Sequence, residues 1–354
     1  MTKAELDNRK ILPLEDSWYR RVKEKLDGIA KPLDGLGKFE HLIAQIGAIE
    51  KTTKISIQKK AVLVMCADNG VVEEQVSQSG KEVTLAVAKA MGVNNSSVGK
   101  MAAVAGVDVI PVDIGIDTDE VIPGVLPRKV AKGTKNFAKE PAMTEEEVLK
   151  AIETGIQLVQ QCHREGYEIL ATGEMGIGNT TTSTAVAAAL LDLEVEQVTG
   201  KGAGLTDEAL KRKCRVIEEA IEKYFLRDAD AFTILKTVGG LDIAGLTGVF
   251  IGAAIEQIPV VIDGVISAGA ALLAETLCKG AVNYMIPSHK SRELAETAIM
   301  KKLHLDPVLD ADMALGEGTG AVMMMSLLDV ALGVYLQGAS FANFEIEQYK
   351  RYEE

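Results

Sequence analysis

The sequence predicts an α/β fold in which a parallel sheet carries helices on both faces. Short apolar runs recur along the chain, and helical patterns of roughly 10–20 residues separate them. Alternation of this kind is typical of parallel sheets, because a crossover helix must return the chain to the edge where the previous strand began. Glycine-rich turns follow several of the apolar runs. In such folds, ligands bind outside the carboxyl ends of the strands.

The expected elements follow from the hydrophobic pattern in chain order. Apolar runs that suit buried strands span residues 59–70, 107–116, 167–172, 260–265 and 281–286. Helical patterns span residues 144–165, 179–191, 206–225 and 269–279, and further ones near the chain ends span 3–10, 17–30, 39–50 and 343–354. The segment 31–38 contains Pro32, Gly35 and Gly37 and is expected to form a loop.

Thr144 marks the most clearly defined helix start. Its hydroxyl suits an N-cap, and the three acids that follow, 145–147, suit the positive end of a helix dipole. Gly166 is expected to stop this helix near Glu165. Taken together, the patterns predict a Rossmann-like large domain over 51–334 and a small helical domain made from both chain ends, 1–50 and 335–354.

The charge balance excludes one broad class of function. The 354 residues include 51 acids and 38 bases, which gives a formal net charge of −13. An acidic surface repels nucleic-acid phosphates, and only 4% of the residues are aromatic, too few for a base-stacking platform. A single small anion needs only a local positive pocket, so it is not excluded.

Membrane insertion and metal chemistry are also disfavoured. The apolar stretch 243–273 contains Glu256 and Asp263, and the stretch 318–337 contains Asp329, so both are expected inside a protein core rather than in lipid. The N-terminus has no apolar signal segment, and a cytoplasmic protein is expected. The four cysteines and four histidines show no metal-ligand spacing, so we expect no metal and no cofactor.

The first motif that suggests chemistry is Gly173-Glu174-Met175-Gly176-Ile177-Gly178-Asn179-Thr180. It follows an expected strand and opens an expected helix. Glycines there let backbone N–H groups approach an anion, and the helix N-terminus adds partial positive charge. The lysine of a triphosphate-binding Walker loop is absent, and a tight turn chosen for packing is the alternative explanation.

A second glycine-rich turn, Gly200–Asp207, is followed by Lys213. The turn offers more backbone N–H groups, and Lys213 offers an ammonium charge, although it could equally be one of several solvated helix lysines. A third cluster, Gly239–Gly245, is explained well by close helix packing. Asp263, at the end of an expected strand, is either a helix N-cap or a ligand to a ribose hydroxyl.

Glu317 lies between glycines in the motif Leu315-Gly316-Glu317-Gly318-Thr319-Gly320-Ala321, ahead of a strongly apolar helix. A partly desolvated carboxylate at this position would suit a general base. The simpler explanation is a loop glutamate that caps the next helix. With all the glycine-rich turns considered together, the sequence favours a pocket that binds a nucleoside monophosphate and uses carboxylates for chemistry.

These motifs occur in the order found in one family. GEMGIGNTTTSTAVAAALL, GKGAGL, VGGLDIAGLTG, VIDGVIS, PSHKSRE and LGEGTGA are joined by KPLDGLGKFE, CADNGVVEEQVSQSG and GTKNFAKEPAMT nearer the N-terminus. The chain resembles the nicotinate-nucleotide:dimethylbenzimidazole phosphoribosyltransferase (CobT) family over about residues 31–335. The resemblance implies a dimer that transfers the phosphoribosyl group of nicotinate mononucleotide to a base for cobamide synthesis.

The resemblance also implies roles for particular residues. Glu317 would act as the general base, and Glu174 would lie beside the ribose and its developing positive charge. The phosphate and ribose would be held by residues from several motifs, namely Gly176, Gly178, Asn179, Thr180, Gly202, Lys213, Asp263 and Ser291.

Departures from the family pattern fall mainly where the incoming base would bind. Asn69 stands where the family usually has His, and Gly80 follows Ser79 where a bulkier residue is usual. The expected acceptor pocket consists of Ser79, Gly80, Val83, Val87, Ala88, Met175 and Leu315. These small and apolar residues leave open an altered acceptor such as phenol or p-cresol, with the chain as one subunit of a heterodimer.

Two other classes of protein are disfavoured by the sequence. A catalytically idle subunit would have no physical need for Glu174 and Glu317 in these positions. A dehydrogenase is disfavoured because no G-x-G-x-x-G motif follows the first expected strand.

Overall fold

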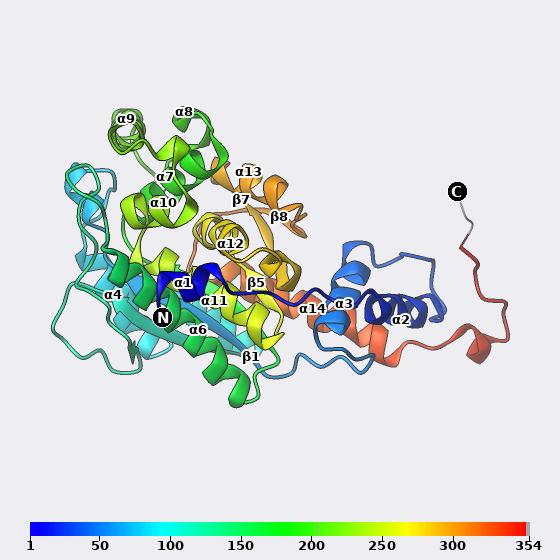
Figure 1. The fold of residues 1–354 in the computed structure, drawn as a ribbon. Helices are drawn as coiled ribbons and strands as arrows, with labels where there is room; N and C mark the ends of the chain where they lie inside the picture. Colours follow the sequence, from blue (N-terminus) through cyan, green and yellow to red (C-terminus); the bar gives the residue numbers. More distant parts are fainter. Residues whose placement is uncertain (203, 352–354) are drawn as a thin grey trace.

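The computed structural model describes residues 1–202 and 204–351, and its centre is a six-stranded parallel sheet (Figure 1). The strand order is β3-β2-β1-β4-β5-β6, and every neighbouring pair runs parallel. The strands are β1 (Lys60–Ala67), β2 (Val107–Gly115), β3 (Leu126–Pro127), β4 (Ile169–Met175), β5 (Val260–Ile262) and β6 (Met285–Pro287). The predicted fold class is confirmed.

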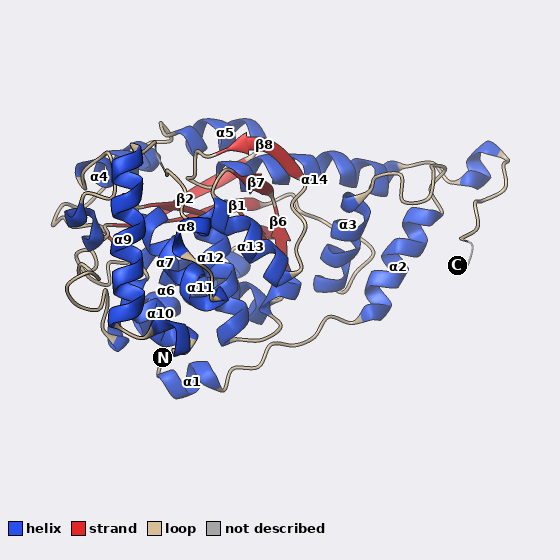
Figure 2. Cartoon of the chain, turned by 90° about the horizontal axis from the view of Figure 1, so that it is seen from above, coloured by secondary structure: helices blue, strands red, loops and turns tan. Residues whose placement is uncertain are grey.

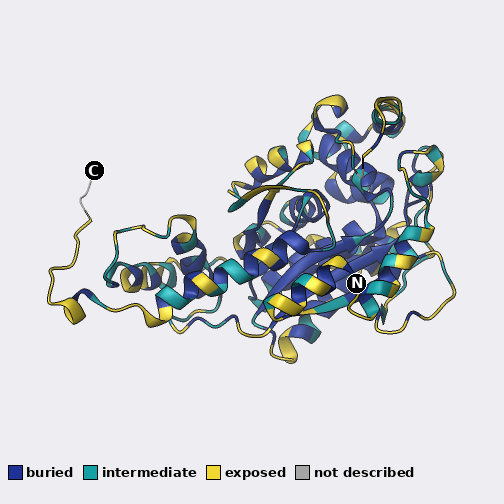
Figure 3. Cartoon of the chain, turned by 180° about the vertical axis from the view of Figure 1, so that it is seen from behind, coloured by how far each residue is buried: buried dark blue, intermediate teal, exposed yellow. Residues whose placement is uncertain are grey.

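Side chains of β1 show why helices must cover both faces. Ala61, Leu63 and Met65 belong to one hydrophobic core, whereas Val62 and Val64 belong to a second core on the opposite face. Successive strand residues point to opposite sides of a sheet. A strand that is apolar at every position therefore has to be buried on both sides, as Figure 3 shows for this sheet.

Two sets of helices supply these covers. The first core includes residues of α6 (Glu145–Arg164), α7 (Asn179–Leu191), α9 (Asp207–Lys223), α10 (Ala231–Val238), α11 (Leu241–Glu256), α12 (Val265–Leu277) and α13 (Leu294–Leu303). The second includes residues of α2 (Asp16–Asp27), α3 (Lys38–Ile49), α4 (Glu82–Gly92), α5 (Ser97–Ala105) and α14 (Thr319–Gln337). The short elements are α1 (Lys3–Asp7), α8 (Val195–Val198) and a two-stranded parallel sheet of β7 (His289–Ser291) and β8 (Leu309–Met313).

The helix predicted after Thr144 is confirmed with its cap. The Thr144 hydroxyl accepts the backbone N–H of Glu147, and the Glu147 carboxylate accepts the N–H of Thr144. This reciprocal capping box satisfies two backbone donors that a helix start would otherwise leave unpaired. The helix predicted over 179–191 is also confirmed at both ends.

The helix predicted over 343–354 is wrong for the part of it that the structure describes. A short 3-10 turn spans Phe341–Phe344, Glu345 adopts a left-handed conformation, and residues 346–351 have no regular secondary structure. Arg351 instead forms ion pairs with Asp27 and Asp34 near α2. These tertiary contacts outweigh the local helical pattern, and residues 352–354 lie outside the described residues.

The C-terminal segment lies beyond the sheet, whereas the N-terminal helix α1 lies against the main body. In Figures 1 and 2, α2, α3 and the C-terminal half of α14 project beyond the sheet, with the C-terminal segment beside them. By contrast, α1 lies on the main body, where Leu6 is buried in the first core and the N-terminal amine pairs with Glu153. The division of the chain into the two domains given above stays a prediction.

Among the described helices, α14 is the one that is long and apolar enough to cross a membrane. It packs against α5, β4 and β5, and 56% of its most apolar 18-residue stretch is buried in the protein. Asp329 in its middle pairs with Lys60 at the start of β1, with 3.1 Å between the charged atoms. These contacts are those of a core helix.

Glu50, the C-cap residue that follows α3, gives a pH-dependent prediction for stability. Its Oε1 is buried without a hydrogen-bond partner, and burial raises the pKa of this carboxyl to about 8 from 4.5. Between pH 4.5 and about pH 8, Glu50 keeps a proton in the folded chain and releases it in the unfolded chain. The contribution of Glu50 to stability therefore falls as the pH rises. Glu50→Gln copies the protonated form. Its urea midpoint is expected to exceed that of the parent protein by a margin that grows from pH 5 to pH 8.

The matched control is Glu219→Gln, since Glu219 is exposed on α9. Its margin over the parent is expected to stay small and constant across the same pH range. Equal behaviour of the two variants would show that Glu50 is not protonated in the folded chain.

Candidate active site

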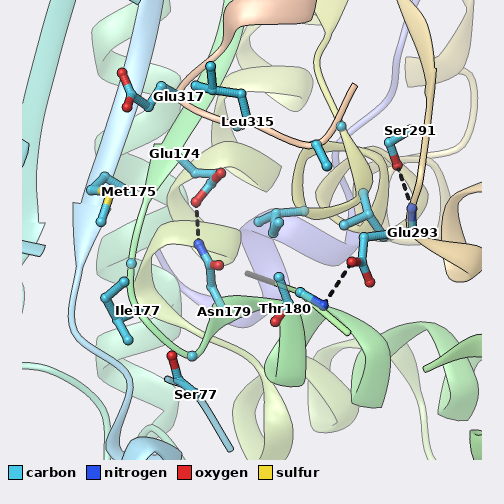
Figure 4. A pocket seen from close by; sticks show the side chains of 18 of the residues that line it. Ser77, Glu174, Met175, Ile177, Asn179, Thr180, Ser291, Glu293, Leu315 and Glu317 are labelled. Carbon is cyan, nitrogen blue, oxygen red and sulfur yellow. Dashed lines mark hydrogen bonds between the residues drawn. The ribbon is translucent and has the colours of Figure 1, made fainter. Parts of the chain in front are cut away.

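A cavity of about 300 Å³ lies at the carboxyl edge of the sheet (Figure 4). Its walls come from segments that follow β1, β4, β5 and β6. Across the sheet, β2 and β3 lie on one side of β1, and β4, β5 and β6 lie on the other side. Crossovers depart to opposite sides at such a reversal and leave a crevice, which is where parallel α/β folds bind ligands.

Most residues singled out from the sequence meet in this cavity. Those that line it are Glu174, Met175, Gly176, Gly178, Asn179, Thr180, Gly202, Asp263, Ser291, Leu315, Glu317 and Val87. Lys213 is fully buried behind the lining, and its Nζ donates to the Thr180 hydroxyl at 3.0 Å. Ser79, Gly80, Val83 and Ala88 are not among the lining residues, and Ala203 of the second glycine-rich turn lies outside the described residues. The roles assigned to all these residues stay predictions.

Glu174 and Asp242 form a buried acidic pair joined by one amide. The Asn179 side-chain nitrogen donates to Glu174 and, at 3.0 Å, to Asp242. Burial raises the pKa of Glu174 to about 8 and that of Asp242 to about 6, against the lowering effect of the Asn179 hydrogen bonds. At neutral pH this part of the cavity therefore retains a proton, held on Glu174.

The loop that carries Glu317 packs directly onto the end of β4. A Cβ atom on Gly316 would lie 2.6 Å from Glu174 Oε1, and one on Gly173 would lie 2.5 Å from the Glu317 carbonyl oxygen. Gly316 also has a φ of +80°, which favours glycine. Glycine at both positions lets the two glutamates approach.

Glu317 itself is half-buried and has a φ of +61°. Its Oε2 accepts the backbone N–H of Val98, in the first turn of α5, at 3.0 Å. In Figure 4 its carboxylate points away from that of Glu174. An uncommon backbone conformation for a non-glycine residue is often found at functional positions.

The Asp263 carboxylate accepts hydrogen bonds from the segment that follows Glu317. Its Oδ2 accepts the backbone N–H of Gly318 at 3.1 Å, and its Oδ1 accepts those of Gly320 at 2.8 Å and Ala321 at 3.1 Å. Burial raises the pKa of Asp263, while nearby His289 and these N–H groups act in the opposite direction. The carboxylate thus caps the start of α14 and fixes the segment that contains Glu317.

The other side of the cavity is suited to an anion. The 13-residue helix α7 begins here, with Gly178 at its N-cap in a left-handed conformation and Asn179 and Thr180 lining the cavity. Gly202, with its own left-handed backbone, lies close to the Thr180 hydroxyl. Backbone N–H groups, a helix N-terminus and the ammonium of Lys213 thus converge on one place.

Several cavity residues were missed from the sequence. Ser77 and Gln78 line the cavity just before the predicted Ser79–Gly80 segment. His289 and Glu293 also line the cavity and lie in the PSHKSRE motif, of which only Ser291 was predicted as a site residue. Position along a loop decides which side chains face a cavity, and the sequence contains no periodic signal for that.

A group of three carboxylates close enough to share a metal occurs elsewhere in the described residues. It consists of Asp27, Asp34 and Glu40. Lys23 pairs with Asp34 and Glu40, Lys31 also pairs with Glu40, and Arg351 pairs with Asp27 and Asp34. These cations already supply the positive charge that the acids need.

Comparison with known proteins gives consistent matches over nearly the whole chain. A family model described as phosphoribosyltransferase (DBI_PRT) matches residues 11–346. A protein of Clostridium acetobutylicum named nicotinate-nucleotide–dimethylbenzimidazole phosphoribosyltransferase is 43% identical over 95% of this chain and 96% of its own. A protein of Acetivibrio thermocellus with the same name is 45% identical over 93% of this chain and 94% of its own.

A solved structure is similar in fold as well. The crystal structure of CobT from Thermus thermophilus aligns with a TM-score of 0.89 and 34% sequence identity. The alignment covers 94% of this chain and all of that one.

Proposed function

We propose a reaction for this chain from the premise that it belongs to the phosphoribosyltransferase family whose model matches residues 11–346. The chain transfers the 5-phosphoribosyl group of nicotinate mononucleotide to 5,6-dimethylbenzimidazole or a related base. The product is an α-ribotide for cobamide biosynthesis. The observation that carries this proposal is one cavity that joins an anion-binding turn to two glutamates and an apolar wall.

The nucleotide's phosphate would bind at the start of α7, where Gly176, Gly178 and Thr180 line the cavity and Lys213 lies behind it. No triphosphate-binding lysine is needed for a monophosphate. Asn179, Gly202 and Ser291 complete the proposed phosphate and ribose contacts. This placement leaves the anomeric carbon towards Glu174.

The chemistry then needs little from the protein at the leaving group. The pyridinium of nicotinate mononucleotide departs readily, and a ring nitrogen of the incoming base attacks from the opposite face with inversion. Positive charge that develops on the ribose lies close to the pair of Glu174 and Asp242, in which Glu174 holds the proton and Asp242 carries the negative charge. The azole N–H proton passes to the Glu317 carboxylate. No redox step occurs.

The apolar wall near Val87, Met175 and Leu315 suits the flat ring of the incoming base. The relatives described above are named for dimethylbenzimidazole. We therefore assign a benzimidazole-type acceptor to this chain.

The decisive experiment is release of nicotinate, measured by chromatography. The purified chain is mixed with nicotinate mononucleotide and dimethylbenzimidazole, adenine or phenol. Release that requires dimethylbenzimidazole, and is at least about tenfold slower with phenol, is expected. Equal or faster release with phenol would contradict the acceptor assignment, and no release with any acceptor would contradict the reaction.

The proposal extends to assembly and location. Apolar side chains are exposed on the adjacent helices α5 and α14, namely Val104, Val330 and Leu336, and a face of this kind suits a homodimer or a pair with a homologous chain. Four cysteines without disulfides suit a cytoplasmic location.

A further inference from the structure

Glu293 is a charged residue in the cavity for which the proposed reaction has no use. It immediately precedes α13, and its side chain lines the cavity together with Lys201 and Gly202. The backbone N–H of Gly202 donates to Glu293 Oε1 at 3.0 Å (Figure 4). The other oxygen, Oε2, rests against Gly200, at a place where any side chain on that glycine would collide with it. The carboxylate therefore lies on the glycine-rich turn itself.

The positive charge of Lys213, beside this turn, explains why a carboxylate lies there. Lys213 is fully buried, and its Nζ donates to two neutral oxygens, the Thr180 hydroxyl at 3.0 Å and the Gly200 carbonyl at 3.2 Å. Within the described residues no carboxylate pairs with Lys213 at 4 Å or less. Burial lowers the pKa of Lys213 to about 8, and of the charges that oppose this effect Glu293 is the strongest. Glu293 is thus the main counter-charge of a buried ammonium group.

We propose that the Glu293 carboxylate occupies the phosphate position of the free protein and is displaced when a phosphate monoester binds. This inference rests on the proposed function, because it uses the same turn as the phosphate site. A phosphate offers oxygens to the same donors, Gly202 N–H and the Lys213 region, and carries more negative charge than a carboxylate. The two anions repel each other, so they do not share the turn.

Displacement requires only a side-chain movement. Glu293 is half-buried, and its neighbours Arg292 and Leu294 are exposed, so solvent is adjacent. Its backbone N–H is held by the Ser291 hydroxyl at 3.3 Å, which anchors the segment while the side chain rotates. Apparent affinity for phosphate is then reduced by the fraction of time for which Glu293 fills the turn. When the product leaves, the same carboxylate returns and prevents rebinding.

The test is Glu293→Gln, measured by titration calorimetry of the full chain with inorganic phosphate and with ribose 5-phosphate. Glutamine still accepts the Gly202 N–H but has no charge, so the fold is retained and the competition is weakened. Affinity for both ligands is expected to rise about tenfold, because the unoccupied turn becomes the dominant state. The matched control is Glu208→Gln, an exposed acid in the first turn of α9, which is expected to leave affinity within twofold.

Unchanged or weaker phosphate binding in Glu293→Gln would overturn the inference. Lys213→Met is measured beside it to locate the phosphate. Loss of phosphate binding in that variant supports the site, whereas unchanged binding places the phosphate elsewhere and overturns the inference. Failure of the proposed reaction has a separate signature: no nicotinate release from the parent chain while Glu293→Gln still binds phosphate more tightly.

Discussion

Glu317→Gln is expected to lower nicotinate release by about 10³-fold, within the range that a general base contributes. Glutamine keeps the shape of the side chain and can still accept the Val98 N–H, but it cannot take the proton of the incoming base. Binding of nicotinate mononucleotide is expected to stay within about twofold of the parent, since the proposed phosphate contacts lie at α7 and Gly202. Chromatographic release rates and titration calorimetry on the same preparations measure the two effects.

A chemical rescue separates the loss of a base from a change in structure. Glu317→Ala opens space beside the acceptor, so added formate is expected to restore part of the release rate in a concentration-dependent way. Glu317→Gln, which fills that space, is the matched control and is expected to show no rescue. If Glu317→Gln retains turnover within a few-fold of the parent, another group removes the proton and the assignment fails.

Asp263→Asn is expected to have the second largest effect. Three backbone N–H groups converge on the Asp263 carboxylate, and an amide group replaces one acceptor oxygen by a donor. At least one buried N–H then loses its partner, which costs about 1–3 kcal/mol of unfolding free energy. The loop that carries Glu317 shifts, so turnover is expected to fall by about 100-fold, with a smaller change in the KM for nicotinate mononucleotide.

This outcome distinguishes two roles for Asp263. A ligand to the ribose, the role that the family resemblance implies, would raise the KM, whereas a positioning residue lowers kcat. A double variant gives a further check: when Glu317 is already Gln, Asp263→Asn is expected to cause little additional loss, because both changes act on one catalytic group. Asp312→Asn, at an exposed acid of β8, is the control for the loss of one negative charge. Additive losses in the double variant would show that Asp263 acts independently of Glu317.

Elements that local interactions determine could be predicted from the sequence, whereas elements that depend on long-range contacts could not. The helices over 145–164 and 179–191 were predictable because a capping box, a glycine turn and local apolar spacing determine them. The irregular segment 346–351 was not, because its course depends on Arg351 meeting Asp27 and Asp34, more than 300 residues earlier in the chain. Long-range ion pairs leave no local pattern.

The same distinction applies to the site. Glycine-rich turns in the sequence were sufficient to predict that Glu174, Asn179 and Glu317 lie together in one site. The partners of each side chain were not predictable: the sequence offered Asp263 as a cap or a ribose ligand, and only the structure shows its oxygens on the Glu317 loop. Nor does spacing indicate that Glu293 turns inwards while Ser79 and Gly80 do not line the cavity.

The helix α14 joins two distant parts of the molecule as a rigid rod. Its first turn follows Glu317, and its last turns lie among α2 and α3, beyond the sheet (Figure 2). At 1.5 Å per residue its 19 residues span about 28 Å. The helices beyond the sheet and the loop of Glu317 are thus fastened to opposite ends of one continuous helix.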